Sequence, residues 1–221
     1  MSENSSENIS VHYADNIHRW PEGVYENYLA ILPVEMQDRI RRFHRWQDAQ
    51  ASLLGKLLLL EAWKPYGLGK EDLGRLLYTE YQRPYLPDHH DFNITHSGTM
   101  VACAINPLGR VGIDIEFYSD IDLNDFKNLW TETEYRDIFD PASPISTFFH
   151  YWARKEAVIK ADGKGLSIPL KDIEITGQEG MVYNREKFHL YNLELTVEAA
   201  SWIATDSPFI LAPNTHRHIY N

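Results

Sequence analysis

Apolar side chains recur at spacings of three and four residues along positions 40–58, which is the pattern of an amphipathic helix. Pro33 stands where such a helix would begin, and a proline and a glycine follow Trp63, where it would end. The resulting span is long for one globular helix. We therefore expect one long helix over residues 33–63, with a bend near residues 46–50.

Shorter stretches in which apolar and polar residues alternate, separated by Pro, Gly, Asn and Asp, predict β-strands. The expected strands cover residues 9–13, 76–81, 92–95, 101–105, 111–117, 173–176, 181–183, 187–190, 193–197 and 201–205. Further helices are expected over residues 122–129, 135–139 (after a capping box at 131–134) and 145–161. Strands and helices do not alternate regularly, which favours an α+β fold over a doubly wound parallel sheet.

Each half of the chain holds a long helix and several strands. We therefore expect two units, an N-terminal half over residues 1–108 and a C-terminal half over residues 109–221.

Composition narrows the class of protein. Hydrophobic residues make up 43% and charged residues 24%, as in ordinary globular proteins, and no apolar run is long enough to cross a bilayer. The net charge of −11 disfavours a nucleic-acid partner. The N-terminal residues are polar and acidic, unlike a secretory signal, and the lone Cys103 cannot form an internal disulfide. We expect a cytoplasmic protein that binds neither nucleic acid nor membrane.

A basic cluster interrupts this acidic composition at residues 39–45, where four arginines and a histidine fall within seven positions. A solvated helix face with acidic neighbours and a binding site for an acidic ligand explain the cluster about equally well.

Two carboxylates stand two residues apart in the segment Val-Gly-Ile-Asp-Ile-Glu-Phe, residues 111–117. In a strand, Asp114 and Glu116 share one face with Gly112, which would leave open space beside them. This arrangement suits half of a site for a hard divalent cation. Taken alone, it is more often a solvated strand face.

A second group of charges lies on the helix expected at residues 145–161. Glu156 and Lys160 share a stripe with Trp152 at i,i+4 spacing, an ordinary helix-stabilising arrangement, while Lys155 lies off to one side. By itself this segment is also read as structural.

A third polar segment reads Asn-Ile-Thr-His-Ser-Gly, residues 93–98. His96 is either a turn residue or a donor to a phosphate oxygen, a role that hydroxyls and backbone amides can share. Ser97 does not fit a hydrolase nucleophile, because the Gly-x-Ser-x-Gly turn is missing. The sequence also lacks a phosphate loop, a dinucleotide fingerprint and zinc-ligand spacing.

The order and the residues of these three segments together resemble the 4′-phosphopantetheinyl transferases, specifically the larger, surfactin-synthetase-activator type. The resemblance also takes in Arg42-Phe43, the segment 48–55, the Arg83-Pro84 turn and Gly-Lys-Gly-Leu-Ser at 163–167. It spans roughly residues 35–170. The family implies two similarly folded α/β halves related by a pseudo-twofold axis, with the active site in the cleft between them.

The family's activity is the transfer of 4′-phosphopantetheine from coenzyme A to a serine of an apo carrier protein (acyl, peptidyl or aryl), with release of 3′,5′-adenosine bisphosphate. The resemblance thus implies a Mg²⁺-dependent enzyme of the holo-[acyl-carrier-protein] synthase type, with Mn²⁺ as an alternative metal. Its partners would be coenzyme A and the carrier protein, and the resemblance implies a monomer.

The resemblance also implies a role for each matching residue. Metal ligands would be Asp114, Glu116 and Glu156. Residues binding coenzyme A would be Arg39, Ser52, Arg83, Thr95, His96 and Lys155, with His96 and Lys155 on the pyrophosphate and Arg83 near the adenosine. Lys160 would neutralise charge as the bridging bond breaks. Glu156, or a water bound to it, would be the general base, and Glu134 is the second choice for that role.

Two departures bear on the 3′-phosphate of coenzyme A. Met36 and Ala51 stand where a Lys and an Arg are expected, so Arg39 and Ser52 are left to hold this group, with Arg41 or Arg45 as substitutes nearby. Two other functions stay open at this point. One is a binding protein of the same fold without catalysis, and the other is an unrelated metal-dependent phosphoesterase.

Overall fold

The computed structural model describes residues 8–140, 142, 144–183, 185–209 and 211–220. It divides into two compact units. Unit 1 comprises Met1–Leu108 together with Leu211–Asn221, and unit 2 comprises Gly109–Ile210. Along the chain, the division between the units falls between Leu108 and Gly109, which is the predicted boundary. The assignment of residues 211–221 to the second half was wrong, because this segment belongs to unit 1.

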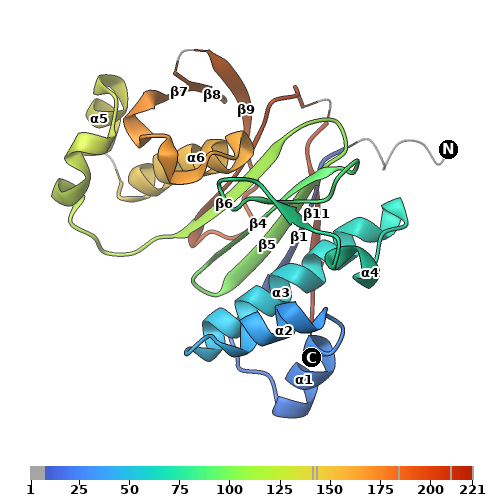
Figure 1. The fold of residues 1–221 in the computed structure, drawn as a ribbon. Coiled ribbons are helices and arrows are strands. Elements are labelled where there is room, and N and C mark those ends of the chain that lie inside the picture. The colour runs from blue at the N-terminus through green and yellow to red at the C-terminus, as the bar shows by residue number, and fades with distance from the viewer. Residues whose placement is uncertain (1–7, 141, 143, 184, 210, 221) are drawn as a thin grey trace. The chain divides into compact units, whose positions relative to one another are not determined.

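Unit 1 is a sheet covered by a long helix (Figure 1). The sheet has the order β11-β1-β5-β4, and only the β1–β11 pair is parallel. Its strands are β1 Ser10–Asp15, β4 Asp91–Ser97, β5 Met100–Asn106 and β11 Asn214–His218. Its helices are α1 Glu22–Leu29, α2 Val34–Arg41, α3 Trp46–Trp63, η1 Lys64–Tyr66 and α4 Lys70–Leu73. A small hairpin pairs β2 Leu77–Tyr78 with β3 Pro84–Tyr85.

Helix α3 packs against β5, β1 and β4, and its leucines supply much of the core of unit 1. The contact is close at Gly55, where a Cβ would lie 2.8 Å from Cγ2 of Ile94. The expected single helix with a bend is in fact two helices, α2 and α3, separated at residues 42–45. The arginines at 39, 41, 42 and 45 fall at spacings of three and four residues. Their like charges would repel one another in a continuous helix.

Unit 2 is also an antiparallel sheet packed against one long helix (Figure 1). The sheet order is β6-β10-β9-β8-β7. The strands are β6 Val111–Phe117, β7 Ile173–Thr176, β8 Glu179–Val182, β9 Glu186–Asn192 and β10 Ala199–Thr205. The helices are η2 Leu123–Leu129, α5 Glu132–Phe139, α6 Ser146–Asp162, η3 Gly165–Ser167 and η4 Leu170–Asp172. The predicted capping box of Thr131 and Glu134 opens α5, and Gly163 ends α6 with a φ of 87°.

The α+β fold class is confirmed, since each unit combines a helix layer with a mainly antiparallel sheet. The pseudo-twofold relation and the cleft stay predictions. One expected strand is wrong. Residues 193–197 form a loop, because Glu194 has a φ of 51° and Leu193 and Leu195 both bond back to Ser201. Among the helices of the described ranges, none combines the length and apolar character needed to cross a membrane.

The strand β11 brings two histidines beside His12 of β1. Nδ1 of His12 lies 2.9 Å from Nε2 of His218, and the rings of His12 and His216 have centroids 4.8 Å apart. Burial, together with these histidines and Lys64, lowers the pKa of His12 from 6.5 to about 4. The folded state therefore favours neutral His12.

We expect the C-terminal strand to loosen in mild acid. The contribution of neutral His12 to stability is fully present above pH 6.5 and is lost as the pH falls towards 4. This loss corresponds to roughly 3 kcal/mol at most. Hydrogen exchange of β11, corrected for the intrinsic pH dependence of exchange, should show less protection at pH 5 than at pH 7. The difference should shrink in His12→Phe, and equal protection of the wild type at both pH values would contradict the assignment.

Candidate functional site

In unit 2, strand β6 and helix α6 pack with their charged residues facing each other. The strand face of Gly112, Asp114 and Glu116 runs in the opposite direction to the helix stripe of Lys160, Glu156 and Trp152. Gly112 contacts the helix backbone at Lys160, Asp114 bonds the Lys160 ammonium, and Glu116 shares a cavity with Trp152. Two motifs about forty residues apart are thereby brought together, as the sequence predicted.

The central group is Asp114, Glu156 and Lys160. Nζ of Lys160 donates to Oδ1 of Asp114 at 2.5 Å, and Asp114 is 3% exposed. Burial and the negative charge of Asp114 raise the pKa of Glu156, while Lys160 opposes that shift. The site thus holds two carboxylates and one ammonium in a partly desolvated place, where electrostatic interactions are stronger than in water.

Gly112 has a different role from the one expected. A Cβ at this position would lie 2.1 Å from the carbonyl oxygen of Ala157 and 2.4 Å from the backbone nitrogen of Ala161. The space beside the glycine is filled by the backbone of α6. The expectation that it leaves room for a ligand was wrong. Gly112 instead allows the helix to approach the strand closely enough for Lys160 to reach Asp114.

Glu116 lies at the edge of an aromatic cavity in unit 2. The cavity has a volume of about 200 Å³ and is lined by Glu116, Ile121, Phe126, Phe148, Phe149 and Trp152. The rings of Phe126 and Trp152 pack edge to face with centroids 5.5 Å apart, and those of Phe148 and Trp152 are stacked. The sequence did not predict this cavity, because its lining comes from three separate elements.

The three predicted metal ligands do not assemble into one group. Within the ranges that the structure describes, no three His, Cys, Asp or Glu side chains are placed to hold a metal ion. The negative charge of Asp114 acts on Glu156 and raises its pKa. Mg²⁺ is commonly bound by one or two carboxylates, with waters and substrate phosphates completing its shell. Asp114 and Glu156 fit that requirement without Glu116.

Lys155 is fully buried and lies away from the charged stripe. Its Nζ donates to the carbonyl of Leu170 at 2.8 Å and forms an ion pair with Oε2 of Glu134 at 2.5 Å. Its ammonium also lies 5.4 Å from the centre of the Trp130 ring. Burial lowers the pKa of Lys155, and the charge of Glu134 opposes that shift. The structure contradicts the expectation that Lys155 binds the pyrophosphate, because no part of its side chain is exposed.

Glu134 is fully buried as well. It accepts hydrogen bonds from the backbone nitrogens of Thr131 at 2.9 Å and Ile175 at 3.0 Å, in addition to its ion pair with Lys155. Both oxygens of the Glu134 carboxylate are thus bonded to groups of unit 2, and the side chain is not exposed. This arrangement removes Glu134 as the second choice for general base and leaves Glu156.

In unit 1, a cavity of about 170 Å³ brings together two of the predicted coenzyme A residues, Arg39 of α2 and Ser52 of α3. The remaining lining residues are Met36, Ile40, Lys56, Leu59, Leu76, Tyr78, Pro84, Phe92 and Ile94. The guanidinium of Arg39 donates to the Tyr78 hydroxyl at 3.4 Å and lies 5.8 Å from its ring centre. Lys56 was missed at first, although it follows Ser52 by one helical turn.

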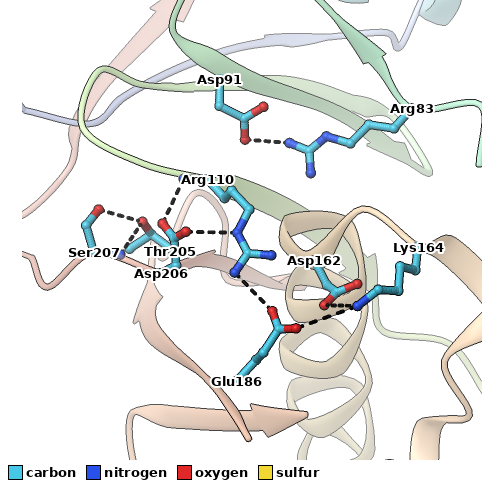
Figure 2. A network of polar contacts seen from close by, with 9 residues as sticks. All are labelled: Arg83, Asp91, Arg110, Asp162, Lys164, Glu186, Thr205, Asp206 and Ser207. Carbon is cyan, nitrogen blue, oxygen red and sulfur yellow. Dashed lines mark hydrogen bonds and ion pairs between the residues drawn. The ribbon is translucent and has the colours of Figure 1, made fainter. Parts of the chain in front are cut away.

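Arg83 precedes Pro84 of this lining and is held by Asp91 (Figure 2). Its Nη2 donates to Oδ2 of Asp91 at 2.6 Å and to the carbonyl of Phe92 at 3.3 Å. The side chain is 12% exposed. The structure therefore fixes Arg83 next to the cavity.

His96 and Thr95 face opposite sides of strand β4. His96 is exposed and shares a face with Ile94, which packs against α3 and lines the cavity. Thr95 is 4% exposed and points to the other face. The polar run at 93–98 is the end of β4 and its turn, with Gly98 at a φ of 51°. His96 thus lies on the face of β4 that packs against α3, the helix that carries Ser52, and Thr95 lies on the other face.

A polar network in unit 2 fixes the start of β6 to the end of the sheet (Figure 2). Arg110 donates to Asp206 at 2.8 Å and to Glu186 at 3.1 Å. Lys164, just after α6, pairs with Asp162 at 3.1 Å and with Glu186 at 3.7 Å. These contacts hold β6 and the end of α6 in place, and so help to position Asp114 and Lys160.

Comparison with known proteins places both units in one family. The profile described as "4′-phosphopantetheinyl transferase superfamily" matches residues 110–210, and "4′-phosphopantetheinyl transferase, N-terminal" matches residues 20–108. The chain is 37% identical over 163 residues to 4′-phosphopantetheinyl transferase Sfp of Bacillus subtilis (strain 168), covering 71% of this chain and 72% of that protein.

Two further relatives show how far the likeness extends. The 4′-phosphopantetheinyl transferase gsp of Aneurinibacillus migulanus is 35% identical over 158 residues, covering 69% of this chain and 66% of that protein. The L-aminoadipate-semialdehyde dehydrogenase-phosphopantetheinyl transferase of Rattus norvegicus is 29% identical over 185 residues, covering 74% of this chain and 59% of that protein. The two profiles together cover most of the chain, and the identity to the Sfp protein is 37% over 163 residues. The chain therefore belongs to the 4′-phosphopantetheinyl transferase superfamily.

Proposed function

We propose that this chain transfers 4′-phosphopantetheine from coenzyme A to a serine of an apo carrier protein in a Mg²⁺-dependent reaction that releases 3′,5′-adenosine bisphosphate. The observation that carries the proposal is the cluster of Asp114, Glu156 and Lys160, formed by two distant motifs in a chain of this superfamily. Two carboxylates beside an ammonium suit a reaction in which charge moves between phosphate oxygens.

In the proposed reaction the serine oxygen forms a bond to the β-phosphorus, and the bond from this phosphorus to the bridging oxygen breaks. The serine proton passes to Glu156, directly or through a water. In the metal-free protein, burial and the negative charge of Asp114 raise the pKa of Glu156. Lys160 places its positive charge where the bridging oxygen becomes anionic. Transfer of this kind depends mainly on positioning and charge neutralisation.

Mg²⁺, or Mn²⁺ in its place, would be held by Asp114 and Glu156. When bound, the metal supplies a positive charge that polarises the phosphate oxygens and orients the reactants. Asp114 accepts a hydrogen bond from the ammonium of Lys160 at 2.5 Å. It would therefore bind the metal ion and also position the Lys160 ammonium. Glu116 would contribute from the edge of the aromatic cavity.

Coenzyme A would be bound by residues of unit 1. Arg39 and Ser52 line one cavity. Ile94 of β4 lines it too, and His96 lies on the same face of that strand as Ile94. Arg83, held by Asp91, would approach the adenosine. Thr95 stays a proposed contact, although it lies on the opposite face of the strand from His96.

The carrier protein is the proposed protein partner, and acyl, peptidyl and aryl carriers fit equally. The net charge of −11 would slow association with an acidic carrier unless a local basic or apolar patch directs docking. We also propose that the protein is monomeric and cytoplasmic, and that it is an enzyme of the narrower holo-[acyl-carrier-protein] synthase type.

Product analysis tests this function against a phosphoesterase that uses the same carboxylates. The protein is incubated with coenzyme A and Mg²⁺, with and without apo carrier protein, and 3′,5′-adenosine bisphosphate is quantified by chromatography. The proposal expects the product only when apo carrier is present. Equal release without carrier would identify hydrolysis, and no release with any carrier class would indicate a binding protein.

A further inference from the structure

The cavity of unit 1 contains a cation that the family resemblance did not assign. Lys56 lies on α3 one helical turn after Ser52, and both side chains line the cavity together with Arg39 of α2. The remaining wall includes the ring of Tyr78 and the apolar residue Pro84. An ammonium, a guanidinium and a hydroxyl thus face the same partly apolar space.

No carboxylate balances these two cations. The lining of the cavity contains no Asp or Glu. Across the part of the chain that the structure describes, Lys56 makes no ion pair or hydrogen bond, and Arg39 contacts only the hydroxyl and ring of Tyr78. Lys56 is half-buried, so its charge is held where water solvates it less well. One half-buried and one exposed positive charge, both lining the same cavity without a counterion, favour an anionic ligand.

An ordinary structural explanation is that Lys56 packs its aliphatic stem on the core and extends its ammonium into water. The surroundings argue against it. Burial lowers the pKa of Lys56; the neighbouring Cys103 opposes that shift and the positive charge of Arg39 adds to it. A bound anion would supply the negative charge that stabilises the ammonium in this place.

We propose that Lys56 and Arg39 together bind a phosphate monoester of a nucleotide ligand whose base packs against the aromatic and apolar wall. This inference rests on the proposed function, under which the group is the 3′-phosphate of coenzyme A. Lys56 then supplies the charge that is missing at Met36 and Ala51. Met36 lines the same cavity, and Ala51 is 4% exposed and packs in the core of unit 1.

The test compares two nucleotides that differ by one phosphate. Binding of 3′,5′-adenosine bisphosphate and of adenosine 5′-monophosphate is measured by calorimetry for the wild type, Lys56→Met and Lys70→Met. Lys70 is an exposed lysine of α4 in the same unit, so Lys70→Met removes the same charge away from the cavity. Thermal unfolding of each variant checks that the fold is kept, and methionine is expected to fit the apolar surroundings of Lys56.

We expect Lys56→Met to weaken binding of the bisphosphate by about tenfold, since a hydrogen bond to a charged group is lost. Binding of the monophosphate should change by less than about twofold, and Lys70→Met should behave as the wild type. In the transfer assay the KM for coenzyme A should rise with little change in kcat. Equal losses for both nucleotides, unchanged binding, or a wild type that does not prefer the bisphosphate would each overturn the inference.

The experiments distinguish failure of the phosphate site from failure of the transferase function. Transfer activity without a role for Lys56 in nucleotide selection would retain the function and reject the phosphate site. Lys56-dependent binding of the bisphosphate without transfer to any carrier would retain the site and reject the function.

Discussion

Replacing Asp114 with asparagine is expected to reduce phosphopantetheine transfer by roughly a hundred- to a thousandfold. The substitution keeps the shape of the side chain and removes its charge. Lys160 then loses the carboxylate that holds its ammonium at 2.5 Å, and the proposed metal site loses one of its two acidic ligands. Steady-state transfer kinetics with coenzyme A and apo carrier would measure the effect, which should fall mainly on kcat.

Asp120→Asn is the matched control, because Asp120 is an exposed carboxylate of unit 2 without an ion pair in the described structure. It should transfer at the wild-type rate. Thermal unfolding should show that Asp114→Asn keeps the fold, since Lys160 is partly exposed and can be solvated. An Asp114→Asn enzyme that is folded and within a fewfold of wild-type activity would contradict the assigned role.

Breaking the buried pair of Lys155 and Glu134 is expected to destabilise the protein by about 3–5 kcal/mol, because the remaining charge is left in the core without a partner. The two single variants are Lys155→Met and Glu134→Gln. The double variant should be more stable than either single one, since it leaves no unpaired charge. Urea unfolding followed by tryptophan fluorescence is suited to this test, as Trp130 adjoins the pair.

The exposed pair of Lys187 and Glu179 in the same unit is the control, with side chains 46% and 48% exposed. Breaking it should cost no more than about 1 kcal/mol. The same variants also distinguish the two roles considered for Lys155. If Lys155→Met kept full stability and lost affinity for coenzyme A, the residue would be a ligand contact and its structural assignment would be wrong.

Much of unit 2 could be predicted from local patterns. Strand β6 has the predicted bounds, and α6 differs from its prediction by one residue at each end, because alternation, helical periodicity and Gly163 all mark them. The contact between Asp114 and Lys160 was also foreseeable, since both motifs pointed to one ligand. Its geometry was not, because the role of Gly112 depends on how closely the helix approaches the strand.

Three of the errors share a physical cause, namely partners that are distant in sequence. Strand β11 is a polar segment whose structure depends on pairing with β1, about 200 residues earlier. The burial of Lys155 depends on Glu134 and on Leu170, which belong to different elements. Lys56 was overlooked because a lysine in a helix is usually solvated, and only the folded cavity shows that it faces Arg39.

The most direct test of the account is the intact mass of an apo carrier protein after incubation with this chain, coenzyme A and Mg²⁺. We expect a gain equal to one phosphopantetheine group, located on a single serine and absent when that serine is replaced with alanine. The gain should also be absent when Asp114→Asn replaces the wild type over the same short incubation. An unchanged mass across acyl, peptidyl and aryl carriers, with coenzyme A bound by the protein, would contradict the account.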